Sequence, residues 1–284
     1  INLFDKANGL KALVNIFRMP ISFPEETVSG KSLVQCACLA LRSYFRTHLL
    51  LAGFQMNQKK TKKKGKLKYM DVHKIAGNHV IFDIFAKHMN TLSCYLQRQS
   101  WQPASDLIAN GGISILIELI IFAFFWKGSH VAHCALEVLQ LITIAPFTHL
   151  SFCEKTRDSS RPGIGVLLSL ISANRFGSAT DVSTMTAALE VIVNIVCLPE
   201  PPALIPPSVT QTRRRICELL RTSDGLGILL NILRENLATN TEALRALACK
   251  ALLGLSQDAT INQILRNMDV NEIVSDLLKQ YKHK

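Results

Sequence analysis

The sequence predicts an all-α fold, an α-solenoid of about four to five helical repeats. Large apolar residues follow a glycine at positions +1, +4, +5 and +8 in four places, which is the spacing of one helix face. Each short helix leads to a longer apolar one, and two of these share a five-residue pattern, Ala135–Leu139 and Ala188–Ile192. Single helix pairs cannot bury such faces, whereas stacked pairs share a continuous core.

Four glycines open the expected short helices, and each follows a residue suited to a turn or a helix start. The pairs are Asn8-Gly9, Gly111-Gly112, Pro162-Gly163 and Asp224-Gly225. Strand signals are weak, because β-branched residues lie inside helical spacings. The repeat is of armadillo type, and the alternative is an irregular all-α globule with glycine-capped helices.

The best-defined long helix is Leu244–Leu255, whose apolar residues recur at i, i+3, i+4 and i+7. Three small residues, Ala246, Ala248 and Ala251, would let a second helix come close. Thr239 and Glu242 are spaced as a capping box, in which each side chain satisfies a backbone N–H of the first turn.

The remaining elements are expected in chain order from periodicity and turn residues. A single domain, residues 1–284, holds them, with a mobile basic insertion at 55–70 and a Pro-rich loop at 199–210, where prolines remove backbone donors. The helical segments are Leu3–Phe17, Ser32–Leu51, His73–Gln97, Gly111–Pro146, Pro162–Pro199, Gly225–Ser256 and Ile261–Leu278, with a polar connection over Phe147–Arg161. The chain begins at Ile1 inside a helical pattern, which predicts a fragment of a longer protein.

Composition indicates an intracellular protein with a large core. Apolar residues make up 48% of the chain, and its eight cysteines include no CxxC pair. Such cysteines on apolar helix faces are typical of buried thiols in a reducing compartment. The apolar run Ile113–Trp126 contains Glu118 and is shorter than the ~20 residues of a membrane span, so a buried central helix is expected.

Positive charge is concentrated in one tract. The net charge is +11, and seven of the lysines lie within residues 58–68. They are Lys59, Lys60, Lys62, Lys63, Lys64, Lys66 and Lys68. Packing cannot bury so much like charge. The tract is therefore a solvated linker, a nuclear-import signal or an electrostatic contact for nucleic acid or an acidic protein.

No catalytic, cofactor-binding or metal-binding constellation is predicted. Gly163-Ile164-Gly165 lacks the third glycine of a dinucleotide fingerprint, and no P-loop, GxSxG or HExxH occurs. His130 and His133 lie beside Cys134, but a second ligand pair is missing. An enzyme is therefore not expected.

Binding is the natural role of a solenoid, because stacking creates a long concave surface. Armadillo proteins that bind extended basic peptides line this surface with an asparagine ladder. Asn194 lies where such a residue would, but Leu141 and Leu252 stand at the corresponding positions elsewhere. One asparagine is not a ladder, so we expect Asn194 to be buried and bonded to backbone.

Several segments together resemble the armadillo-like N-terminal region of the Vpr-binding-protein family. They are Phe4–Asn15, Ala40–Leu49, Ala135–Pro146, Val191–Pro199 and Leu244–Ser256. Members of that family are substrate receptors that dock on a cullin-4 RING ubiquitin ligase through a damaged-DNA-binding adaptor.

The resemblance implies a non-catalytic protein–protein scaffold in ubiquitin transfer, located in the nucleus and also in the cytoplasm. In the family a C-terminal propeller grips the adaptor and an upstream LisH motif supports self-association, so the adaptor contact is expected outside this chain. Partners are then cullin-4 ligase components, substrates or another copy. The alternative is binding of nucleic acid or an acidic partner through the lysine tract and Arg213–Arg215. No cofactor and no membrane are expected.

Overall fold

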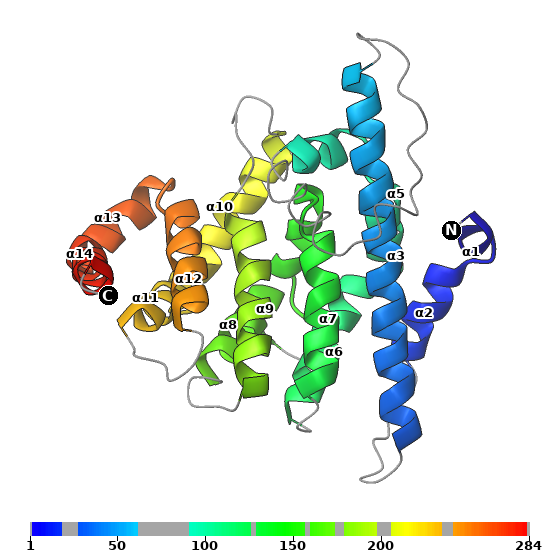
Figure 1. Cartoon of the computed structure of the whole chain (residues 1–284), viewed down its shortest axis with the longest axis horizontal. Coiled ribbons are helices and arrows are strands. Elements are labelled where there is room, and N and C mark those ends of the chain that lie inside the picture. The colour runs from blue at the N-terminus through cyan, green and yellow to red at the C-terminus, as the bar shows by residue number, and fades with distance from the viewer. Residues whose placement is uncertain are drawn as a thin grey trace.

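The computed structural model describes residues 2–18, 28–61, 91–125, 129–156, 160–173, 179–197, 206–234 and 241–282. Over these ranges the chain is α-helical and 3₁₀-helical, and its only β feature is an isolated bridge between Lys155 and Pro162. The helices pack one after another along the long axis of the molecule (Figure 1). The predicted all-α solenoid is therefore confirmed.

The repeating unit has three elements, whereas the sequence indicated two. A short first element precedes the helix that begins at each glycine, and a long helix follows. The first two units are α1 (Asn2–Lys6), α2 (Gly9–Arg18) and α3 (Val28–Thr61), then α5 (Gln102–Ala109), α6 (Gly112–Phe125) and α7 (Ser129–Ile142). The next two are η2 (Pro146–Cys153), α8 (Gly163–Ala173) and α9 (Ala179–Val196), then α10 (Pro207–Thr222), α11 (Gly225–Arg234) and α12 (Thr241–Leu255).

Two further helices, α13 (Ala259–Asn267) and α14 (Val270–Lys282), correspond to the first two elements of a fifth unit. Residues 91–98 form another helical stretch before α5. The rest of the helix predicted over His73–Gln97 lies outside the described residues, as does Thr239 of the predicted capping box.

Equivalent elements stack on one another and form layers. The long helices α3, α7, α9 and α12 contact each other in chain order, and so do α2, α6, α8, α11 and α14. The third layer joins α5, η2 and α10. Figure 1 shows α3, α7, α9 and α12 side by side, so one face of the molecule consists of long helices.

The four predicted glycines are each the first residue of a helix, α2, α6, α8 or α11. The preceding Asn8, Gly111 and Asp224 have positive φ angles of 53°, 66° and 54°, which turn the chain sharply between helices. At Gly225 a Cβ would lie 2.8 Å from the carbonyl oxygen of Leu220 in α10. Glycine therefore lets the second helix of that unit begin against the end of the first.

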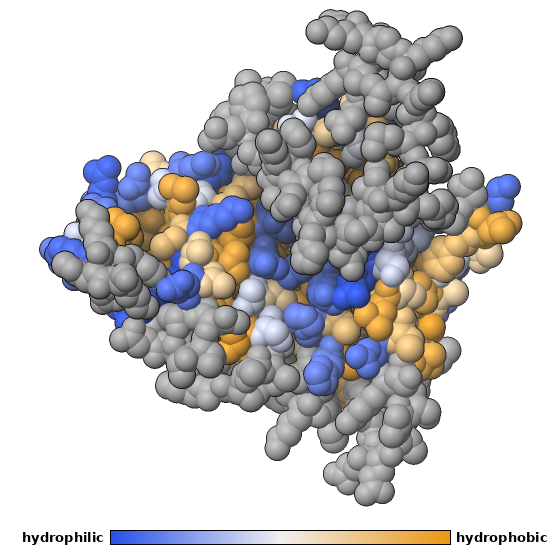
Figure 2. All heavy atoms as spheres, viewed as in Figure 1, coloured by the Kyte–Doolittle hydropathy of each residue, from blue (hydrophilic) through white to orange (hydrophobic). Residues whose placement is uncertain are grey.

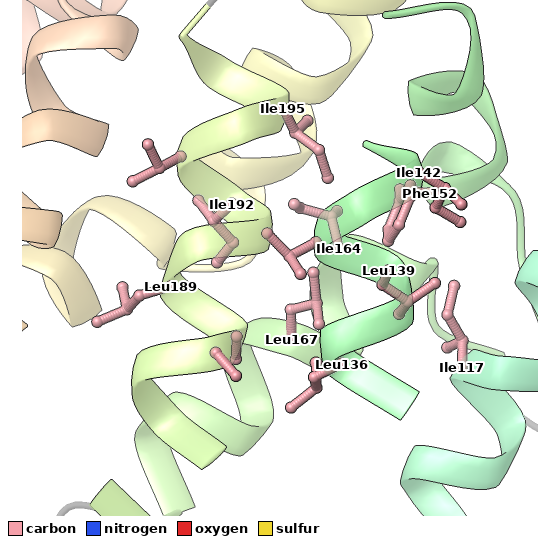
Figure 3. Packing of buried hydrophobic residues seen from close by; sticks show 14 of the residues in the cluster. Ile117, Leu136, Leu139, Ile142, Phe152, Ile164, Leu167, Leu189, Ile192 and Ile195 are labelled. Atoms are coloured by element: carbon pink, nitrogen blue, oxygen red, sulfur yellow. The ribbon is translucent and has the colours of Figure 1, made fainter. Parts of the chain in front are cut away.

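One hydrophobic cluster runs from Leu10 to Leu265 through every layer. In its central part, side chains of α6, α7, α8 and α9 point toward one another, with Phe152 of η2 beside Ile142 (Figure 3). Phe152, Leu136, Leu139 and Ile192 are fully buried. Continuous packing is what a stack of units that cannot fold alone requires.

The predicted polar connection over Phe147–Arg161 is wrong in its first half. Pro146–Cys153 forms the 3₁₀ helix η2, and Phe152 and His149 expose only 0% and 2% of their surface. The reason is positional, because η2 takes the place of the first helix of the third unit and packs between α5 and α10.

Two other predicted boundaries need correction. The basic insertion was expected over residues 55–70, yet α3 continues to Thr61, where Met56 is buried and Gln55 Oε1 accepts a hydrogen bond from Tyr95 Oη at 3.3 Å. The Pro-rich loop was expected over 199–210, yet α10 begins at Pro207, because proline is well suited to the first turn of a helix. Residues 62–70 and 199–205 lie outside the described part, and the single domain over 1–284 stays a prediction.

Of the apolar run Ile113–Trp126, the described part up to Phe125 lies in α6, and its inward side chains, from Ile113 to Ala123, are buried in the core, as expected for a central helix. Within the described ranges no single helix has the length and hydropathy to span a membrane; one bent pair, Gln102–Ala109 with Gly112–Ala123, meets the criteria of length and composition alone.

Candidate protein-interaction surface

Polar side chains link the long helices along their shared face. Arg42 of α3 points its Nη1 at both carboxylate oxygens of Glu137 in α7, at 2.6 and 2.5 Å. Both side chains are partly exposed, with 37% and 25% of their surface accessible. Such a pair contributes about 1 kcal/mol or less to stability, so its main effect is to fix the positions of the two charges.

A second link joins α7 to α9. Gln140 Nε2 donates to Glu190 Oε2 at 2.7 Å and to the carbonyl oxygen of Ala187 at 3.2 Å. Burial raises the pKa of Glu190, while the charge of Lys250 in α12 acts in the opposite direction. We call Arg42, Glu137, Gln140, Glu190 and Lys250 the polar row. Figure 2 shows hydrophilic residues across the middle of this face, where Figure 1 places α7 and α9.

A shallow pocket of about 330 Å³ lies between α7 and α9 within the polar row. Its walls are His133, Glu137, Gln140, Val182, Ser183, Thr186, Ala187 and Glu190. The Nδ1 atom of His133 is shielded from solvent and has no hydrogen-bond partner in the structure. Leaving a buried polar atom unsatisfied costs about 1–3 kcal/mol, so this atom lowers the stability of the folded chain.

Asn194 bonds to the backbone as predicted, but it is half-buried where burial was expected. Its Nδ2 donates to the backbone oxygen of Gln140 at 3.1 Å and to Thr143 Oγ1 at 3.2 Å. Through these two hydrogen bonds the side chain links α9 to the carboxyl end of α7. Its amide is therefore used to hold two units together, unlike a ladder residue that faces a bound peptide.

The predicted electrostatic residues are only partly placed. Lys59 and Lys60 belong to the last turn of α3, and Lys62, Lys63, Lys64, Lys66 and Lys68 lie outside the described residues. The arginines Arg213–Arg215 lie in the middle of α10, and Arg213 Nη2 donates to Gly254 O at 2.8 Å and to Gln257 Oε1 at 2.7 Å. Arg213 thus binds α12 internally, whereas Arg214 and Arg215 are exposed.

The remaining chemical candidates behave as structural groups. His130 is exposed and His133 is half-buried, and in the described ranges no three His, Cys, Asp or Glu residues converge as metal ligands would. All eight cysteines are free, and Cys38, Cys134, Cys153 and Cys217 are buried. Burial raises the pKa of Cys38 to about 12 and that of Cys153 to about 11, so both thiols are protonated and unreactive at neutral pH.

The polar row was not predicted from the sequence, although a signal for it was present. Glu137 and Glu190 occupy the same place in the two copies of the shared five-residue pattern. Stacked repeats bring equivalent positions together, so a charged residue recurring inside an otherwise apolar pattern marks the face that the helices leave uncovered.

The fold defines an all-α helical-repeat protein. Two family models match the chain: the DCAF1 helical domain over residues 34–225 and the DCAF1 fourth domain over residues 229–284. The first match alone covers more than half of the chain, including α7, α9 and most of α3. The chain therefore belongs to the DCAF1 family, and the predicted Vpr-binding-protein family is confirmed.

Curated relatives agree with this assignment. The chain is 25% identical over 366 aligned residues to the DDB1- and CUL4-associated factor homolog 1 of Arabidopsis thaliana, covering 98% of the chain and 19% of the relative. It is 22% identical over 304 residues to protein mahjong of Drosophila melanogaster, covering 93% of the chain and 20% of the relative. The chain thus spans about a fifth of each relative's length.

Among solved structures, an engineered protein superimposes with a TM-score of 0.49 and 12% identity, over 94% of this chain and 89% of that protein. Likeness at this level adds nothing to the assignment.

Proposed function

We propose that this chain is a protein–protein interaction scaffold within a substrate receptor of a cullin-4 RING ubiquitin ligase. The match of residues 34–225 to the DCAF1 helical domain carries the proposal, and the Arabidopsis relative is named as a DDB1- and CUL4-associated factor. A receptor brings proteins together and leaves ubiquitin transfer to other subunits, so the role is non-catalytic.

The long-helix face supports this role. Its polar row is partly exposed, and the pocket between α7 and α9 is lined by three residues of this row, Glu137, Gln140 and Glu190. Partners on this face are substrates, cullin-4 components or another copy of the receptor, while the adaptor is bound elsewhere in the parent protein. The proposed location is the nucleus and also the cytoplasm.

The test is affinity purification of the tagged chain from cells, with identification of bound proteins by mass spectrometry. The chain is compared with a variant in which the seven lysines of the tract are changed to glutamine. Recovery of cullin-4 components or a known ligase substrate with both forms supports the scaffold. If only nucleic acid or import receptors are recovered, and the lysine changes abolish their binding, the scaffold proposal is overturned in favour of the lysine tract.

A further inference from the structure

We infer that the pocket between α7 and α9 binds the side chain of an arginine presented by a partner polypeptide. This inference rests on the proposed role in protein binding, and it specifies the chemistry of one contact. The pocket volume of about 330 Å³ is at the lower end of the range for ligand sites, which suits one long side chain better than a cofactor.

The hydrogen-bonding groups of the pocket are mostly acceptors. Gln140 Nε2 has two protons, and it donates to Ala187 O and to Glu190 Oε2. The hydroxyl of Thr186 donates to the backbone oxygen of Val182 at 2.7 Å. What these groups leave for a ligand are acceptor positions: Gln140 Oε1 and the second oxygen of Glu190, beside a Glu137 carboxylate whose two oxygens already accept from Arg42.

His133 lies on the α7 wall of the pocket, beside Glu137 and Gln140. Its Nδ1 is shielded from solvent and is out of reach of a ligand, so the ring reports on binding without contributing an acceptor. A ligand that donates several hydrogen bonds and accepts none satisfies the acceptor positions of Gln140 and Glu190 at once. A guanidinium has five N–H donors in a rigid plane and no acceptor.

Electrostatics favours the same ligand. The Glu190 carboxylate is half-buried, and this burial raises its pKa because it weakens the solvation of the charged form. A guanidinium beside it replaces the lost solvation with a charge-assisted, planar pairing that an ammonium forms less well. The Arg42 guanidinium donates to both oxygens of Glu137 through Nη1 within this chain, so the face already contains one arginine–glutamate pair.

Positive charges on the long-helix face limit which partner residues can flank the bound arginine. Arg42 on one side and Lys250 on the other carry positive charge across the long helices, and the chain is strongly basic overall. A run of basic residues is repelled there, whereas a single arginine among neutral or acidic residues is accepted. The pocket therefore differs in specificity from surfaces that bind extended basic peptides.

The test uses the purified 284-residue chain and two small probes, N-acetyl-arginine amide and its neutral analogue N-acetyl-citrulline amide. Binding is followed by NMR titration of the His133 imidazole resonances. We expect saturable shifts with the arginine probe and at least tenfold weaker binding of the citrulline probe, which has the same shape without the charge. Equal binding of both probes, or absence of saturable shifts at His133, overturns the inference.

Variants locate the site. Glu190→Gln removes the charge but keeps an oxygen that accepts from Gln140, and it should weaken binding of the arginine probe at least tenfold. Glu218→Gln, on the exposed side of α10, is the matched control and should bind as the parent chain does. Unchanged binding by a folded Glu190→Gln variant contradicts the inference.

Ser183→Lys is a second variant, in case Glu190→Gln is unstable. Ser183 is exposed at the rim of the pocket, so a lysine there folds readily and supplies a competing cation, which should abolish binding. This readout is independent of the cellular purification. If the arginine probe binds but no ligase components are recovered, the inference about the pocket stands and the scaffold proposal fails. If ligase components are recovered but the arginine probe does not bind, only the inference about the pocket fails.

Discussion

In α12, the effect of a substitution on stability depends on which face of the helix the residue occupies. Ala248 is completely buried at the seam with the neighbouring helices, whereas Ala246, two residues earlier, is exposed. We predict that Ala248→Asp lowers the free energy of unfolding by several kcal/mol, because it places an unpaired charge in the core. Ala246→Asp should change stability by less than about 0.5 kcal/mol.

Thermal unfolding followed by circular dichroism compares the two variants. Equal melting temperatures for both would contradict the buried face assigned to α12.

His149 makes stability depend on pH. Its Nε2 lies 2.7 Å from the carbonyl oxygen of Thr143, and complete burial lowers its pKa from 6.5 to about 4. Below pH 6.5 the unfolded chain binds a proton that the folded chain rejects. The stabilisation is therefore fully present above pH 6.5 and is lost as pH falls toward 4, by up to about 3 kcal/mol.

Urea unfolding between pH 7 and 4.5 measures this loss, with His149→Gln as the comparison. The variant should lose less stability over this interval than the parent chain. Identical pH dependence of the two proteins would show that His149 is not the responsible group.

At the scale of elements, each helix pair depends on a glycine at the junction. In Gly225→Ala the new methyl group meets the carbonyl oxygen of Leu220 at 2.8 Å and Leu168 Cδ1 at 3.2 Å. Because a backbone atom cannot move away as a flexible side chain can, we predict a loss of about 1–3 kcal/mol.

Gly53→Ala is the matched control. Gly53 lies inside α3, where an added methyl group would meet no other atom within 4 Å, so alanine should stabilise the chain by about 0.4–1 kcal/mol. Denaturant unfolding of both variants tests the pair. A stabilising Gly225→Ala would mean that α10 and α11 are less tightly joined than the structure shows.

At the scale of the whole molecule, stability should fall toward the carboxyl end. In a stack each unit contacts only its neighbours. Helices α7 and α9 have long-helix neighbours on both sides, whereas α14 has no buried residue among those whose exposure is described. We predict that amide hydrogens exchange much faster in α13 and α14 than in α9.

Hydrogen exchange read by mass spectrometry on the intact chain checks this gradient. Equal protection of α9 and α14 would instead indicate a molecule that unfolds as one cooperative unit.

Periodicity along the chain was enough to predict the second and the long helix of each unit, and the starting points of the second helices. The spacing of apolar residues after Gly9, Gly112, Gly163 and Gly225 depends on contacts a few residues apart, and all four glycines begin helices. The first elements α5 and η2 escaped prediction, since η2 is buried by its position between α5 and α10 and not by a pattern of its own.

The candidate site required the tertiary structure. The sequence alone determined the helical class, the repeat, the family resemblance and the concentration of lysines, because each is a local or compositional property. Only the stacking of α3, α7, α9 and α12 brought Arg42 to Glu137, Gln140 to Glu190 and Asn194 to the end of α7. These partners are about 50 to 95 residues apart in the chain, and their contact depends on the register between neighbouring helices, which no local spacing specifies.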